Sequence, residues 1–149
     1  MKKIIVTGCN GQLGRAINEV YSNSSEFECV NTDVAELDIT NAEAVMQAYE
    51  AGQRAFGESR VQELQIKYEA LPKDIEWVMI GHLQTNKVKY IAPFISLIES
   101  LDSERLAVEV QRQAERCNRV IDCLLEIHVT DEASKSGWVW DELLAFVRE

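Results

Sequence analysis

Short apolar segments alternate with amphipathic segments along the whole chain, and this alternation constrains the fold more than any other feature. Between the apolar segments, apolar residues recur every three or four positions, as in helices that bury one face. Residues 12–21 form one expected helix, and a later one buries Leu106, Val110, Ala114 and Cys117. The expected strands are residues 3–7, 27–31, 54–57, 75–80, 95–101 and 120–129. Strands that alternate with helices predict a parallel sheet flanked by helices, which is an α/β fold.

Chain length helps to decide how these strands are arranged. A complete eight-stranded barrel takes roughly 200 residues or more, and this chain has 149. We therefore expect a single α/β domain over residues 1–149, a Rossmann-like open sandwich of about six strands with the fourth strand beside the first. The alternative is an incomplete TIM-type barrel, whose exposed sheet edge and apolar face would favour a homo-oligomer.

Charge and composition exclude several classes of protein. The net charge is −10 and the basic residues are scattered, which argues against nucleic acid or an anionic membrane as a partner. The apolar run YIAPFISLI is too short to span a bilayer, and no apolar leader precedes Gly8, so we expect a cytoplasmic protein. Four cysteines show no CxxC spacing and His82 lies far from His128, so we expect no metal site.

Local signals set the ends of two helices. Ser59 and Gln62 have the spacing of a capping box, as do Thr40 and Glu43. Gly52 follows the helix that begins at the Thr40 and Glu43 capping box and is a typical C-terminal stop.

Gly8-x-x-Gly11-x-x-Gly14 follows the first strand and opens a helix. Glycines let the backbone turn sharply and approach a pyrophosphate, and a helix N-terminus presents free amides to it. Asp33, just after the second strand, is placed to accept the ribose hydroxyls. The alternative is a plain tight turn. The residues expected to bind a cofactor here are Gly8, Gly11, Gln12, Leu13, Gly14 and Asp33.

The segments TGCNGQLG and LDITN, at this separation, resemble the N-terminus of dTDP-4-dehydrorhamnose reductases over residues 1–45. The resemblance implies NAD(P) at the glycine-rich segment, with Asp38 and Ile39 beside the adenine. That family reduces its substrate with a Tyr-x-x-x-Lys pair. Here the residues four positions after the tyrosines are Ser25, Gln53, Pro72 and Phe94. We therefore expect no enzyme, and at most weak NAD(P) binding.

From residue 48 onward the chain resembles another family. The segments FGESRVQEL and GHLQTNK are similar to the pyridoxal 5′-phosphate (PLP) homeostasis proteins, relatives of the barrel of alanine racemase. The resemblance implies a PLP-bearing lysine on the first barrel strand and a phosphate-binding segment in the last third of the barrel. Lys2 and Lys3, the lysines of the first strand here, lie at its N-terminal end, whereas sites in such folds form at the C-terminal ends of the strands. The phosphate-binding segment has no counterpart in this sequence. We therefore expect PLP to be unlikely and no cofactor to be required.

Three retained positions have a functional and a structural interpretation. His82 faces a ligand or caps the end of a strand with hydrogen bonds, and Lys87 pairs with phosphate or is a solvated helix charge. Lys135 is a candidate PLP acceptor because it follows a strand end, but nothing near it in the sequence supplies a phosphate cradle or a partner for the pyridinium nitrogen. Ser59, His128 and Asp131 stand where the family usually has Asn, Asn and Gly. Trp138 and Trp140 are expected to be core or interface aromatics.

The two resemblances meet inside the expected helix of residues 41–52, whereas natural fusions usually join domains through an exposed linker. Our hypothesis is an engineered chimera of a Rossmann-derived fragment, residues 1–47, and a PLP-barrel-derived fragment, residues 48–149. It would have no catalytic activity and at most vestigial nucleotide binding. The alternative is a protein that retains one inherited site, either a NAD(P)-dependent sugar-nucleotide reductase or a PLP-binding protein.

Overall fold

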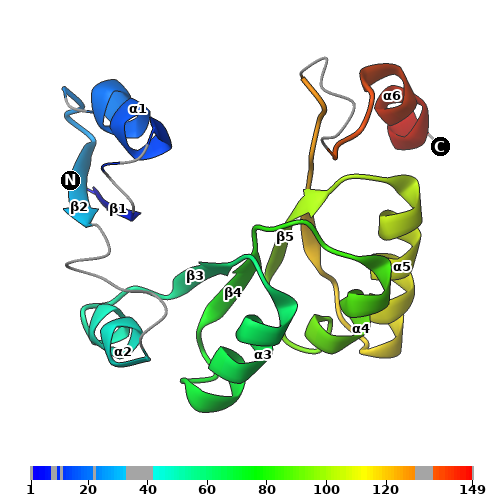
Figure 1. Ribbon diagram of the computed structural model, residues 1–149, viewed down its shortest axis with the longest axis horizontal. Helices are drawn as coiled ribbons and strands as arrows, with labels where there is room; N and C mark the ends of the chain where they lie inside the picture. The colour runs from blue at the N-terminus through cyan, green and yellow to red at the C-terminus, as the bar shows by residue number, and fades with distance from the viewer. Residues whose placement is uncertain are drawn as a thin grey trace. The chain divides into compact units, whose positions relative to one another are not determined.

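The computed structural model describes residues 2–7, 10, 12–21, 23–32, 42–129 and 136–148. The chain forms two compact units, residues 1–53 and 54–149, and each has its own parallel sheet (Figure 1). The single domain expected from the sequence, and its fragments 1–47 and 48–149, stay predictions. The boundary between the observed units follows Gln53.

The first unit contains a strand–helix–strand arrangement. Strands β1 (Lys2–Thr7) and β2 (Phe27–Thr32) pair in parallel from Lys2 opposite Phe27 to Thr7 opposite Thr32. Helix α1 (Gln12–Tyr21) connects them, with the bounds that its apolar spacing predicts. This is the βα connection that parallel neighbours require, because a tight hairpin cannot join them.

Helix α2 (Ala42–Glu50) ends two residues before Gly52, the predicted C-terminal stop. The φ angle of Gly52 is 102°, a left-handed conformation that glycine adopts without a Cβ penalty. The amide of Gly52 donates to the carbonyl oxygen of Tyr49 (2.9 Å), and that of Gln53 donates to Ala48 (3.0 Å). These bonds satisfy carbonyl groups that the last turn of the helix leaves free. Thr40 of the other expected capping box lies outside the described residues.

The second unit is built on four parallel strands in the sequential order β3-β4-β5-β6. They are β3 (Ala55–Glu58), β4 (Glu76–Met79), β5 (Leu97–Leu101) and β6 (Asp122–Leu125). The helices of this unit are α3 (Val61–Ala70), the short turn η1 (Thr85–Lys87), α4 (Val88–Ile91), α5 (Glu104–Arg116) and α6 (Trp140–Arg148). Figure 1 shows α3, α4 and α5 following one another along the sheet. The prediction of an α/β fold with a parallel sheet flanked by helices is confirmed.

The prediction of one sheet of about six strands is wrong. The described strands form a sheet of two and a sheet of four. The fourth strand does not pair with the first, because the neighbours of β4 in its sheet are β3 and β5. Each helix of the second unit carries the chain to the adjacent strand position, and no described connection returns it across the sheet. The strand order therefore lacks the reversal that defines a doubly wound sandwich.

Alternate side chains of the second sheet pack under its helices. Trp77 and Met79 of β4 and Ile98 of β5 are at most 1% exposed. Leu106, Val110 and Ala114 of helix α5 are buried as well, as their spacing predicts. Burying each large apolar side chain of this kind contributes about 1.5–3 kcal/mol. This core holds the loops at the ends of the strands.

The expected capping box at Ser59 and Gln62 is wrong. The N-cap of α3 is Arg60, and its side chain makes no capping hydrogen bond. The carboxylate of Glu58 acts instead: its Oε1 accepts hydrogen bonds from the amides of Ser59 (2.7 Å) and Arg60 (3.1 Å). The amide of Ser59, which the capping box would pair with the Gln62 side chain, therefore binds a charged acceptor instead, and hydrogen bonds to charged acceptors are stronger.

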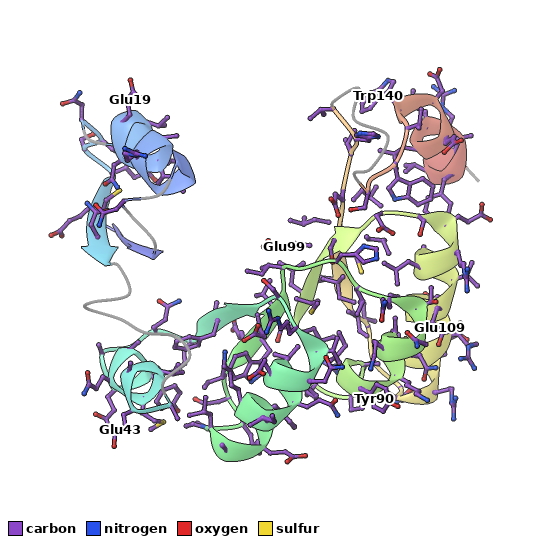
Figure 2. The ribbon with its side chains drawn as sticks, in the orientation of Figure 1. Glu19, Glu43, Tyr90, Glu99, Glu109 and Trp140 are labelled. Atoms are coloured by element: carbon purple, nitrogen blue, oxygen red, sulfur yellow. The ribbon has the colours of Figure 1, made fainter. Side chains whose placement is uncertain are left out.

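The two tryptophans near the C-terminus have different environments. Trp138 is 5% exposed, and its Nε1 donates a 2.8 Å hydrogen bond to the carbonyl oxygen of Leu101. Its ring centroid lies 4.7 Å from that of Phe146 on α6. Trp140 is 56% exposed (Figure 2) and is not a core residue. Among the described helices, none has the length and apolar character needed to cross a membrane.

Candidate functional site

The carboxyl ends of β3, β4 and β5 lie at one edge of the second sheet, because the strands are parallel neighbours. The loops that leave this edge begin at Ser59, Ile80 and Asp102. Ligand sites of parallel α/β sheets form where such loops converge. Two pockets of the second unit open among these loops.

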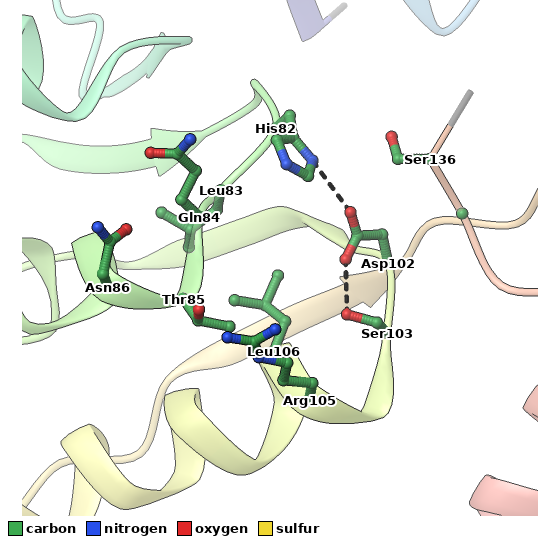
Figure 3. A pocket seen from close by; sticks show the side chains of 11 residues that line it. His82, Leu83, Gln84, Thr85, Asn86, Asp102, Ser103, Arg105, Leu106 and Ser136 are labelled. Atoms are coloured by element: carbon green, nitrogen blue, oxygen red, sulfur yellow. Dashed lines mark hydrogen bonds and ion pairs between the residues drawn. The ribbon is translucent and has the colours of Figure 1, made fainter. Parts of the chain in front are cut away.

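The larger pocket has a volume of about 650 Å³ and lies over the carboxyl ends of β4 and β5 (Figure 3). It contains a guanidinium group, a carboxylate, an imidazole, amides and hydroxyl groups. Its lining residues are His82, Leu83, Gln84, Thr85, Asn86, Asp102, Ser103, Arg105, Leu106, Ser136 and Gly137. This volume falls within the range of about 300–1,000 Å³ that is usual for small-molecule sites.

A close approach and a hydrogen bond connect three of these side chains. Nδ1 of His82 lies 3.0 Å from Oδ2 of Asp102, and the Ser103 hydroxyl donates a 2.9 Å hydrogen bond to Oδ1 of the same carboxylate. Both contacts are drawn in Figure 3. The Asp102 side chain is 10% exposed, whereas the His82 side chain is 60% exposed. The carboxylate is therefore fixed, and it holds an imidazole that stays open to ligands.

The backbone beside His82 is fixed as well. The hydroxyl of Ser100, a residue that is 3% exposed, donates a 2.6 Å hydrogen bond to the carbonyl oxygen of Gly81. A Cβ atom on Gly81 would lie 2.4 Å from the carbonyl oxygen of Ser59. This close approach of the β3 and β4 loops requires glycine, and it sets the position from which the His82 side chain starts.

The smaller pocket has a volume of about 210 Å³ and adjoins the first. His82 and Gln84 line both pockets. The remaining lining residues of the smaller pocket are Ser59, Arg60, Val61, Gln62 and Lys87. The Lys87 Nζ lies 5.7 Å from the ring centroid of Tyr90, so its ammonium group is oriented partly by that ring.

Glu58 anchors the loop that forms one wall of the smaller pocket. Its Oε2 pairs with Lys67 Nζ on α3, and its Oε1 accepts hydrogen bonds from the amides of Ser59 and Arg60, just before the helix. Burial raises the pKa of the Glu58 carboxyl, but the hydrogen bonds from Lys67, Arg60 and Ser59 outweigh burial. The net pKa is below the ordinary glutamate value, so the carboxylate stays charged at neutral pH.

The predicted cofactor residues all belong to the first unit, whereas both pockets are lined by residues of the second unit. Gln12, Leu13 and Gly14 form the first turn of α1, as a dinucleotide segment requires. The other predicted residues, Gly8, Gly11, Asp33, Asp38 and Ile39, lie outside the described residues, as do Asp131 and Lys135. The assignment of a cofactor to this segment stays a prediction.

Sequence reasoning named His82 and Lys87 but missed Asp102, Ser103, Arg105 and Asn86. The signal available for Asp102 and Ser103 was their place directly after the fifth strand, where parallel sheets present functional side chains. Within the described ranges, no group of three histidine, cysteine or acidic side chains is arranged to hold a metal ion.

Several curated proteins that resemble this chain share one description. No protein-family model matches the chain. The pyridoxal phosphate homeostasis protein of Aquifex aeolicus is 48% identical over 96 residues, and that of Synechocystis sp. is 43% identical over 98 residues. Each match covers 64% of this chain but only 42% or 45% of the relative. The chain spans somewhat less than half the length of these curated relatives.

Solved structures give the same result. PipY of Synechococcus elongatus without PLP is 36% identical with a TM-score of 0.68, covering 72% of this chain and 51% of PipY. PipY with PLP bound is 30% identical with a TM-score of 0.67, covering 92% of this chain and 63% of PipY. The resemblance to PLP homeostasis proteins is therefore confirmed. None of these relatives is a reductase, so the reductase resemblance of residues 1–45 gains no support from them.

Two hypotheses from the sequence are wrong. The chain is not explained as an engineered chimera without function, because 64% of it matches a bacterial PLP homeostasis protein at 48% identity. The expectation that PLP is unlikely and that no cofactor is required conflicts with the PLP bound to PipY. The first hypothesis rested on two resemblances that meet inside one helix, and the second on the lack of a counterpart to the family's PLP-bearing lysine. The relatives' names specify no catalysed reaction, which agrees with the expectation that the chain is not an enzyme.

Proposed function

We propose that residues 54–149 bind PLP in the larger pocket at the carboxyl edge of the β3–β6 sheet and catalyse no reaction on it. One observation carries the proposal: a polar pocket of about 650 Å³ lies at this edge in a chain that is 30% identical to a solved protein with PLP bound. Binding and release of the cofactor would suffice for a role in PLP homeostasis.

The donor groups of the pocket fit the two ends of PLP. The Arg105 guanidinium and the Asn86 amide are suitable donors for a phosphate, since arginine presents paired N–H groups to phosphate oxygens. Leu83 and Leu106 supply apolar surface for a pyridine ring. When bound, PLP supplies an electrophilic aldehyde beside an electron-withdrawing ring.

The proposal is for non-covalent binding in the larger pocket. None of the described residues that line it is a lysine. Lys87 lines the smaller pocket, which shares His82 and Gln84 with the larger one. Arg105 and Asn86 would orient the phosphate, and Leu83 and Leu106 would exclude water from one face of the ring.

The same evidence supports the incomplete TIM-type barrel as the architecture of residues 54–149. In a barrel, parallel strands follow one another in sequence order, as β3 to β6 do here. The structures of PipY align with this chain with TM-scores of 0.67–0.68. Two further expectations stay predictions: a cytoplasmic location, and a homo-oligomer formed through a sheet edge or an apolar face. Size-exclusion chromatography with light scattering tests the second, and a monomer at high concentration would contradict it.

Titration with PLP tests the proposed function. We expect PLP to raise the unfolding temperature, because it binds only the folded chain, and pyridoxal without phosphate to bind more weakly. Arg105→Gln should weaken PLP binding about tenfold, since a hydrogen bond to a charged group contributes about 1.5–3 kcal/mol. Arg112→Gln is the matched control, because Arg112 on α5 pairs with Glu109 outside both pockets. Equal PLP affinity in both variants, or no binding by the wild type, would overturn the proposal.

The glycine-rich segment of the first unit is a second, independent candidate. We propose that Gly8, Gly11, Gln12, Leu13 and Gly14 bind the phosphate group of a nucleotide, with Asp33, Asp38 and Ile39 toward the nucleoside. This assignment is supported by the strand–helix–strand arrangement of the unit, in which α1 connects the parallel strands β1 and β2. Thermal shifts with NADH and NADPH, repeated with Gly11→Val, test it. A shift that survives Gly11→Val would place the nucleotide elsewhere.

A further inference from the structure

His82 combines an exposed side chain with a fixed position. The side chain is 60% exposed, yet its Nδ1 is held 3.0 Å from an Asp102 carboxylate that is 10% exposed. The carbonyl oxygen of the preceding residue, Gly81, accepts a 2.6 Å hydrogen bond from Ser100. An imidazole on a surface normally samples several rotamers, because nothing compensates the entropy lost on fixing one. Here the surrounding residues select one orientation before any ligand arrives.

The Asp102 carboxylate also selects one tautomer of the neutral ring. A carboxylate has no proton to donate, so of the two neutral tautomers of His82 the one with the proton on Nδ1, 3.0 Å from Oδ2, is favoured electrostatically. In a neutral imidazole the other nitrogen then has a free lone pair. The second carboxylate oxygen accepts from the Ser103 hydroxyl (2.9 Å), which keeps Asp102 from rotating away. Nε2 of His82 is consequently presented as a hydrogen-bond acceptor.

The acceptor has a defined place in the site. His82 lines both the larger pocket, drawn in Figure 3, and the smaller pocket. Arg105 and Asn86 of the larger pocket can only donate hydrogen bonds through their nitrogen atoms, and they suit an anion. His82 therefore adds the opposite property, recognition of a ligand donor such as a hydroxyl group or a ring N–H.

We propose that Asp102 is a positioning residue and that His82 Nε2 accepts a hydrogen bond from the hydroxyl group or ring N–H of a pyridoxal-type ligand. This inference rests on the proposed function. It assigns recognition of the ring to His82, and recognition of the phosphate to Arg105 and Asn86. A simple phosphate ester or inorganic phosphate, which lacks the ring donor, gains nothing from His82.

The state of the ring can be measured without any ligand. In ¹⁵N-labelled wild-type protein, at a pH where the ring is neutral, we expect the nitrogen chemical shifts of His82 to report a proton on Nδ1. In Asp102→Ala the proton is no longer confined to Nδ1, and the shifts should move toward the other tautomer. Ser103→Ala is the matched control, because it keeps the carboxylate. A proton on Nε2 in the wild type would overturn the inference even if PLP binds.

Ligand affinities provide the second readout. Asp102→Ala and His82→Phe should each weaken PLP binding about tenfold while leaving the affinity for inorganic phosphate unchanged, and Ser103→Ala should have a smaller effect. Equal losses for PLP and phosphate, or no loss for PLP, would contradict the assignment to the ring. No PLP binding by the wild type would defeat the proposed function, whereas binding that ignores Asp102 would defeat only this inference.

Discussion

The Ser100 hydroxyl on β5 donates a 2.6 Å hydrogen bond to the carbonyl oxygen of Gly81, the second residue after β4. Gly81 in turn lies against the backbone of Ser59, after β3. These contacts join the ends of three neighbouring strands through one glycine. The loops that line both pockets thus depend on the same small contact area.

Gly81→Ala should destabilise the second unit by about 1–3 kcal/mol, as overpacking usually does. The new Cβ would meet the carbonyl oxygen and Cα of Ser59 at 2.4 and 2.8 Å, and these backbone atoms cannot rotate away. Gly57→Ala is the matched control, because its Cβ would meet only the side chain of Ile80, at 3.2 Å. We expect its effect to stay within about 1 kcal/mol. Urea unfolding of both variants checks this, and equal midpoints would contradict the close approach at Gly81.

Glu58→Gln should lower the free energy of unfolding by about 1–3 kcal/mol at pH 7, because it replaces a charged acceptor of three hydrogen bonds. The folded pKa of Glu58 is below its ordinary value of 4.5, so the folded chain binds fewer protons there than the unfolded chain. Its contribution is therefore full above pH 4.5 and is lost as the pH falls through the folded pKa.

Denaturation at several pH values checks this sign. The difference between the wild type and Glu58→Gln should shrink as the solution is acidified, and Glu69→Gln, an exposed change on the same helix, should show little difference at any pH. A gap that widens on acidification would mean that Glu58 is not the stabilising carboxylate.

Trp138→Phe should cost about 1–3 kcal/mol, because it removes the buried hydrogen bond to Leu101 and part of the contact with Phe146. Trp140→Phe should change the stability by less than about 0.5 kcal/mol, since Trp140 is 56% exposed. Thermal unfolding compares the two directly. A larger effect of Trp140→Phe would contradict the packing of α6 described here.

The sequence predicted local structure better than arrangement. Apolar spacing gave the bounds of α1, and the burial of Leu106, Val110 and Ala114 followed from their period. Periodicity could not separate Trp138 from Trp140, because both lie near the start of α6 and only contacts with Leu101 and Phe146 distinguish them. The prediction of how the strands group into sheets failed for a similar reason, because strand pairing depends on contacts between segments far apart in the chain.

The site was only partly predictable. His82 was a candidate because it follows a strand, but its partner Asp102 is twenty residues away and meets it only through the pairing of β4 with β5. The capping of α3 was predicted wrongly because Ser59 and Gln62 fit a known pattern, whereas the Glu58 carboxylate, one residue before Ser59, accepts the Ser59 amide that the Gln62 side chain would take in that pattern. Such competition is decided by side-chain geometry, which spacing does not contain.

Mapping of PLP on ¹⁵N-labelled protein tests the central claim most directly, because it locates the ligand as well as detecting it. Binding in the larger pocket predicts that PLP shifts the backbone amide signals of residues 81–86 and 102–106 together, with one dissociation constant, and that Arg105→Gln weakens all of them. Shifts confined to the first unit, or scattered among surface lysines without saturation, would contradict a PLP site at the carboxyl edge of this sheet.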